Sequence, residues 1–277
     1  MYTRVFNKMT AEDIQAYLDR GGNTLFIAVG VVEVHGSMPV DVEQVIPEGF
    51  ALAMAEKADG LAVTNLPFFF PGGTVISPAT VQVSVRESIN YLMMLSRSFI
   101  AQGFRKLFFV SAHGPARLYI DAACRDIFQE TKVHACHLNI GDVTMRDPNF
   151  AFTDFDAMGC GAYKMLHQME FLKIDPNAPE PEPRDPQNTN APYERLARLL
   201  RPYGSPVSIV FGDPKEHGGG RAFRSEQERL ERCEYGEKLI RRYVDGMDLE
   251  GIKQALDDYD VYVKEMAEKI PRLKGIY

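Results

Sequence analysis

The sequence predicts an α/β protein: a three-layer α/β/α sandwich with a mostly parallel central sheet. Two observations carry this prediction. Continuous apolar runs, such as residues 24–32 and 106–112, have the composition of strands that are buried on both faces. Segments with helical periodicity separate these runs, and such helices are the connections that parallel strands require. The 277 residues are therefore interpreted as one domain, 1–277.

Each expected element has a local signal. Thr10 and Asp13 resemble a capping box that begins a helix, and Gly21 ends it. Pro47 suits the first turn of the next helix, and Gly103 suits the end of a third. The expected helices are residues 10–20, 47–58, 84–102, 115–130, 163–172, 223–245 and 249–268, and the expected strands are 24–32, 61–66, 106–112, 132–140 and 207–211.

The segment 175–192 contains six prolines, a composition typical of an extended loop. A domain linker is the alternative. However, the residues that follow contain few strand signals and do not suggest a second core. We therefore expect a long loop within one domain, followed by the C-terminal helices.

Composition excludes several classes of function. The net charge of −7 and the lack of a Lys/Arg cluster argue against a nucleic-acid partner. No apolar run is long enough to span a membrane, and the first residues lack the apolar segment of a signal peptide. The four cysteines form no CxxC pair, so we expect free thiols in the cytoplasm.

Ligand-type side chains follow two of the expected strands. Glu33 and His35 come directly after the first strand, and His113 follows the third. Because sites in parallel sheets gather at the carboxyl ends of the strands, we expect these side chains to meet. Carboxylate oxygens and imidazole nitrogens are common ligands of zinc and similar ions. The alternative is that all three are ordinary polar residues at strand ends.

The other histidines are weaker candidates. His134 and His137 lie three apart on an expected strand and face opposite sides, so we interpret them as structural. His167 lies in an expected helix and has no matching partner. His217 lies in a glycine-rich loop that is a candidate to close over a site.

Two further segments have two interpretations each. Asp41 and Glu43 supply another carboxylate, or they lie near a helix start, where negative charge is favourable. The segment 68–74 forms a wall of a small-molecule pocket, or it is a packed loop.

Several motifs, taken in order, resemble the creatininase family. The family typically has Glu-Gln-His-Gly where this chain has Glu33-Val34-His35-Gly36, and Asn-Gly-His-Gly where it has Ser111-Ala112-His113-Gly114. Further matches are Pro71-Gly72-Gly73-Thr74-Val75-Ile76-Ser77, Gly212-Asp213-Pro214 and Glu234-Tyr235-Gly236-Glu237. The resemblance implies a hydrolase that uses one or two divalent metals to open cyclic amides or cleave formamides, and an assembly that is often a hexamer.

By this resemblance, Glu33, His35 and His113 occupy metal-ligand positions. The position of the family's metal-bridging Asp holds Gln44, with Glu43 beside it, and no Glu matches the last family ligand. We therefore expect one divalent ion (Zn, Mn or Fe), with Asp41, Glu43 or His217 as a possible further ligand. The expected catalytic residues are Glu33, His35 and Glu43, and the expected substrate-binding residues are Gln44, Gly73, Thr74 and His217.

The leading hypothesis is a hydrolase in which a metal-activated water attacks a small cyclic substrate. A metal ion lowers the pKa of such a water to about 7. The alternatives are a hydrolase that breaks a carbon–carbon bond in a diketo-inositol-type ring, a metal-free acid/base isomerase or lyase using Glu33 and His35, and a non-catalytic binding subunit. The expected partners are a small-molecule substrate and further copies of the chain in a homo-oligomer.

Overall fold

The computed structural model describes residues 2–73, 78–149, 153–178, 191–204 and 222–270. Its helices are η1 (Phe6–Lys8), α1 (Ala11–Asp19), α2 (Val42–Lys57), α3 (Val85–Gln102), η2 (Gly114–Ala116), α4 (Arg117–Thr131), α5 (Ile140–Met145), α6 (Thr153–Met165), η3 (Met169–Phe171), α7 (Ala191–Leu200), α8 (Glu226–Asp245) and α9 (Leu249–Lys269). No described helix combines the length and the apolar composition that a bilayer crossing requires.

The described residues contain a four-stranded parallel sheet in the order β2-β1-β3-β4. Its strands are β1 (Thr24–Ala28), β2 (Leu61–Val63), β3 (Lys106–Ser111) and β4 (Ala135–Asn139). The register runs continuously across the sheet, because Ile27 pairs with Phe109 and Phe109 pairs with His137. The predicted parallel sheet is confirmed.

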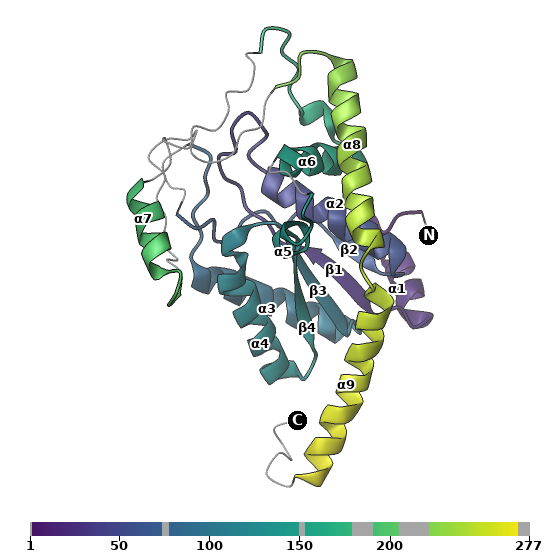
Figure 1. Ribbon diagram of the computed structural model, residues 1–277. Coiled ribbons are helices and arrows are strands. Elements are labelled where there is room, and N and C mark those ends of the chain that lie inside the picture. The colour runs from purple at the N-terminus through teal and green to yellow at the C-terminus, as the bar shows by residue number, and fades with distance from the viewer. Residues whose placement is uncertain (1, 74–77, 150–152, 179–190, 205–221, 271–277) are drawn as a thin grey trace.

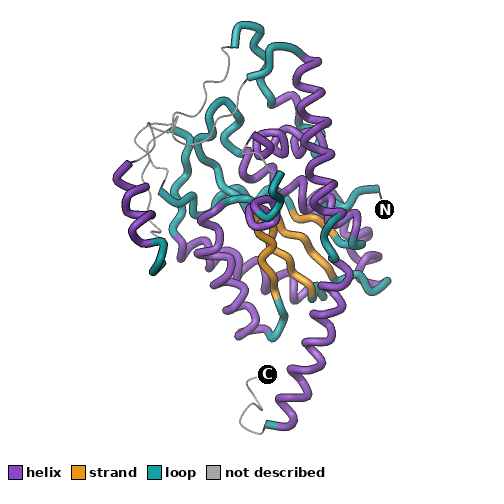
Figure 2. The backbone as a smooth tube through the Cα atoms, viewed as in Figure 1, coloured by secondary structure: helices purple, strands orange, loops and turns teal. Residues whose placement is uncertain are grey.

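Helices cover both faces of the sheet, as Figures 1 and 2 show. Alternate residues of β3 enter different cores: Phe108 packs in the core beneath α2, α6 and α8, whereas Phe109 packs in the core beneath α3 and α4. The alternation follows from the two-residue period of a strand. The predicted three-layer arrangement is confirmed, and α9 extends beyond the layers.

Two expected boundaries were wrong around the first crossover. The first strand ends at Ala28 rather than at residue 32, because beyond Val29 the backbone no longer follows the sheet ladder. Helix α2 begins at Val42 and carries Pro47 inside it. A proline removes one helical hydrogen bond, but nearly every residue around it is buried, and this packing outweighs the loss. As a result, Glu43 lies in the first helical turn.

The expected helix at 163–172 was also misplaced. The structure has α6 ending at Met165, a turn at His167 with φ of 57°, and the short helix η3. Helix α6 forms because Gly159 and Gly161 allow close packing on α2 and α8. Helix α7 was not expected, and it overlaps the end of the segment 175–192. The expected strand at 207–211 lies outside the described residues.

A chain of hydrogen bonds ties β3, β4 and α4 together. His137 Nε2 lies 2.7 Å from Ser111 Oγ, and His137 Nδ1 lies 2.6 Å from Asp121 Oδ1. The order Ser–His–Asp is that of a hydrolytic triad. Ser111, however, has no exposed surface, so a substrate cannot reach its hydroxyl. We interpret the chain as structural, in agreement with the expected role of His137.

The stability of the fold should depend on the protonation of His137. Burial lowers the pKa of this imidazole, although Asp121 opposes the effect. The unfolded chain therefore binds the proton more readily, and stability should be lost as pH falls below the ordinary value of about 6.5. Urea unfolding should be measured at about pH 7.5 and at about pH 5.5. Between these two values, the free energy of unfolding should fall less for His137→Gln than for the wild type. His167→Gln, on the exposed turn after α6, is the control, and equal losses in all three proteins would contradict this expectation.

Candidate metal centre

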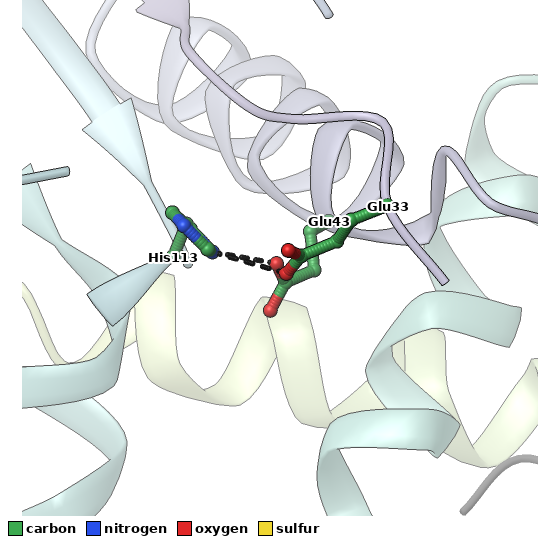
Figure 3. A group of neighbouring side chains, drawn as sticks. All are labelled: Glu33, Glu43 and His113. Atoms are coloured by element: carbon green, nitrogen blue, oxygen red, sulfur yellow. Dashed lines mark hydrogen bonds and ion pairs between the residues drawn. The ribbon is translucent and has the colours of Figure 1, made fainter. Parts of the chain in front are cut away.

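Three acidic or imidazole side chains meet at the carboxyl end of the sheet. Glu33 lies in the loop after β1, Glu43 lies in the first turn of α2, and His113 lies two residues after the end of β3. The backbone N–H of Glu33 donates to the carbonyl of Val40 at 2.9 Å, which closes the loop between β1 and α2. This closure brings the two carboxylates to the same side of His113 (Figure 3).

The three side chains are close enough to share one cation. Their ligand atoms all lie within 4.8 Å of one another. His113 Nδ1 lies 2.6 Å from Glu43 Oε2 and 3.5 Å from Glu33 Oε1. The exposed fractions are 1% for Glu33, 6% for Glu43 and 3% for His113. A site this well buried shields its charges from water.

The carboxylates change the acidity of two neighbours. Burial alone lowers the pKa of His113, but Glu43, Glu33 and the backbone of Pro71 outweigh it, so the net shift is upward. A metal ion and a proton would therefore compete for this imidazole. Burial, together with the charges of Glu43 and Glu33, raises the pKa of Tyr119 well above its ordinary value, so its phenol stays neutral.

The residues of this group fit a divalent cation. Two carboxylates and one imidazole supply three protein ligands, the number found in catalytic sites that keep a position for water or substrate. The charges of Glu43 and Glu33 act on the buried hydroxyl of Tyr119. This hydroxyl has no hydrogen-bond partner among the described residues. A buried polar atom of this kind ordinarily has a partner, which indicates that the site is completed by a ligand or water.

His35 is not a member of this group. It is 4% exposed, and its ring is tilted against that of Phe155 with centroids 5.6 Å apart. The chain turns at Gly36, directly after His35, where φ is 58°. Among the described residues, the group contains Glu43 in addition to Glu33 and His113. The role of His35 as a ligand or catalytic residue stays a prediction.

Of the four expected substrate-binding residues, the structure describes Gln44 and Gly73, which lie in separate segments of the chain. Gln44 hydrogen-bonds the carboxylate of Glu48 through its Nε2 at 2.7 Å. Gly73 lies in the turn after Pro71, and Gly72 of that turn packs against Pro115, two residues beyond His113. Thr74 and His217 lie outside the described residues. The substrate-binding roles of all four stay predictions.

Tyr119 was not anticipated from the sequence. It is fully buried on α4 and stacks on Phe69, with ring centroids 5.6 Å apart and planes 2° from parallel. A tyrosine on the inner face of a helix is usually an ordinary core residue, so only the fold brings it to the carboxylates. The segment around Phe69 therefore contributes to packing beside the site.

Comparison with known proteins identifies the family of this chain. The model of the family described as Creatininase, creatinine amidohydrolase, matches residues 7–216. The chain belongs to the creatininase family. Comparison with curated protein sequences returns no significant match. The resemblance found in the sequence motifs is thereby confirmed, and the family points to a hydrolase.

Solved creatininase structures share the fold at low sequence identity. A mutant creatininase superposes with a TM-score of 0.61 at 17% identity and covers 92% of this chain and 99% of its own. A structure described as creatininase Mn has a TM-score of 0.60 at 16% identity and covers 87% and 97%. A mutant described as the Zn–Zn type has a TM-score of 0.55 at 16% identity and covers 88% and 98%.

Proposed function

We propose that this creatininase-family protein is a metal-dependent hydrolase that opens a small cyclic amide. The observation that carries the proposal is the buried group of Glu33, Glu43 and His113 at the carboxyl end of a parallel sheet. Its substrate is a small molecule, and we expect the protein to act as a homo-oligomer in the cytoplasm.

The charges of the group support a divalent ion. Two buried carboxylates beside one imidazole would be stabilised by a cation placed among them, because an unbalanced buried charge is costly. Two oxygen ligands and one nitrogen ligand suit Zn, Mn or Fe, and relatives with Mn and Zn in their descriptions share the fold. When bound, such an ion polarises a carbonyl and lowers the pKa of water.

The protein's own residues would orient the reaction. The backbone of Pro71 interacts with the ring of His113, whose Nδ1 faces both carboxylates, and this fixes the orientation of the ligand. A carboxylate oxygen of Glu33 or Glu43 that is not used as a ligand would accept the proton of the attacking water.

A second candidate function needs no metal. The 2.6 Å contact between His113 and Glu43 is short enough for a general acid/base pair. This pair would support an isomerase or lyase on the same scaffold. The metal-dependent function is preferred because Glu33 adds a third ligand-type group at the same point.

Metal content and hydrolysis test the proposal together. Protein purified without chelator, or reconstituted with Zn, Mn or Fe, should hold about one equivalent of metal. It should then open at least one member of a panel of five- and six-membered cyclic amides, detected by the carboxylate released. Chelation should abolish this activity, and re-addition of metal should restore it. Activity that survives metal removal would favour the acid/base function, and a failure to bind any of the three metals would overturn the proposal.

A further inference from the structure

A cavity of about 650 Å³ lies beside the first half of α2. None of the three residues of the candidate metal centre lines it. Its lining combines hydrogen-bond acceptors with aromatic rings and includes Asp41, Gln44, Glu48, Phe68, Tyr91 and Phe171. No Lys or Arg is among the described residues that line it, so its two acidic side chains have no basic side chain beside them in the lining.

The central feature of the cavity is the carboxylate of Glu48. Glu48 is only 3% exposed. Its Oε1 accepts hydrogen bonds from Gln44 Nε2 at 2.7 Å and from the backbone N–H of Asn65 at 2.6 Å. Asn65 has a φ of 63°, a backbone conformation that non-glycine residues seldom adopt. The described residues place no basic side chain within ion-pair distance of Glu48. A cationic partner would stabilise the charged form of a carboxylate buried in this way.

Two further acceptors share the face of α2 that carries Glu48. Asp41 precedes the helix, and Gln44 and Glu48 follow at spacings of three and four residues, which places all three on one side. Gln44 is 3% exposed, and its Oε1 has no hydrogen-bond partner among the described residues. Burial raises the pKa of Glu48, and the negative charge of Asp41 adds to this effect. A cation in the cavity would satisfy the amide oxygen and relieve the repulsion between the two acids.

Aromatic rings form the outer wall. Phe68 is 53% exposed and Phe171 is 61% exposed, and both line the cavity together with Tyr91. Aromatic faces attract cations and also cover apolar stems. The cavity is therefore apolar and aromatic on one side and an acceptor of hydrogen bonds on the other.

We propose that this cavity binds a primary organic ammonium ion, with Glu48 as its charged partner. An ammonium group has three N–H donors and no acceptor, which matches the acceptors offered by Asp41, Gln44 and Glu48. The alkyl stem of such a ligand lies against Phe68 and Phe171. The cavity is separate from the metal ligands, so binding does not depend on the proposed hydrolase function.

Calorimetric titration of the full chain with n-butylammonium chloride tests this inference, with 1-butanol as the neutral probe of similar shape. The ammonium should bind, and the alcohol should bind at least about tenfold more weakly, because hydrogen bonds to a charged group are stronger than those between neutral groups. Glu48→Gln should weaken ammonium binding by about 10- to 100-fold. Glu12→Gln, which removes an exposed charge on α1, should have no effect.

Further arms separate this site from the metal centre and from a folding defect. Titrations in the presence of chelator, and with Glu43→Gln, should give the wild-type affinity. Phe171→Ala, which changes a side chain exposed on the surface, should also weaken binding and serves as the test if Glu48→Gln does not fold. No ammonium binding, equal binding of butanol, or an unchanged affinity in both Glu48→Gln and Phe171→Ala would overturn the proposal.

Discussion

Exchange of Glu43 for glutamine should weaken divalent-metal binding by more than about 100-fold, and exchange of His35 for alanine should weaken it much less. Residues that only support a metal ligand typically contribute 10- to 100-fold in affinity, so loss of a ligand carboxylate should exceed about 100-fold. Glu43 Oε2 lies 2.6 Å from His113 Nδ1 and belongs to the group of shared ligand atoms, whereas the ring of His35 packs against Phe155.

The measurement is a competition titration against a chelating dye with Zn and with Mn. Glu56→Gln is the matched control, because it makes the same substitution near the other end of α2, where the side chain is 43% exposed and pairs with Arg241. Thermal unfolding without metal checks that each variant folds. A loss of affinity that is larger for His35→Ala than for Glu43→Gln would show that the cation lies nearer to His35.

The parallel sheet could be predicted because its buried strands appear in the sequence as continuous runs of apolar residues. The carboxyl ends of those strands could not be located as well, since the apolar run of the first strand continues past Ala28 after the sheet hydrogen bonds end. Local rules also misplaced α2, because the helix starts before Pro47 and tertiary packing outweighs the missing hydrogen bond. Most of helix α6 was missed because its glycines have low helix propensity, although they allow the close packing that the fold requires.

The metal centre could be predicted in part for a similar reason. Glu33 and His113 come soon after strands β1 and β3, so a parallel sheet alone brings them to one edge. Glu43 joins them only through the turn between β1 and α2, whose closing hydrogen bond from Glu33 to Val40 has no sequence signal. Tyr119 lies on the buried face of α4, and its place near the carboxylates depends on how the helix docks on the sheet.

Exchange of Gly236 for alanine should destabilise the protein by about 3 kcal/mol or more. An added Cβ would lie 1.6 Å from the carbonyl oxygen of Ala157, a distance that only a shift of one backbone could relieve. Overpacking of a tight core costs about 1–3 kcal/mol and sometimes more, which outweighs the gain of about 1 kcal/mol in helix propensity. The neighbouring contact is equally tight, since a Cβ at Gly161 would lie 2.1 Å from the backbone nitrogen of Glu237.

Urea unfolding measures the effect, and Gly246→Ala is the control on the same helix. Gly246 has a φ of −74°, and an added Cβ there would meet its nearest neighbour at 3.5 Å, so stability should change by less than about 1 kcal/mol. Because α6 and α8 both pack on α2, separating them should also loosen the helix that carries Glu43 and so weaken metal binding. If Gly236→Ala were as stable as the wild type, α6 and α8 would not cross as closely as the structure places them. The position of α2 would then depend on other contacts.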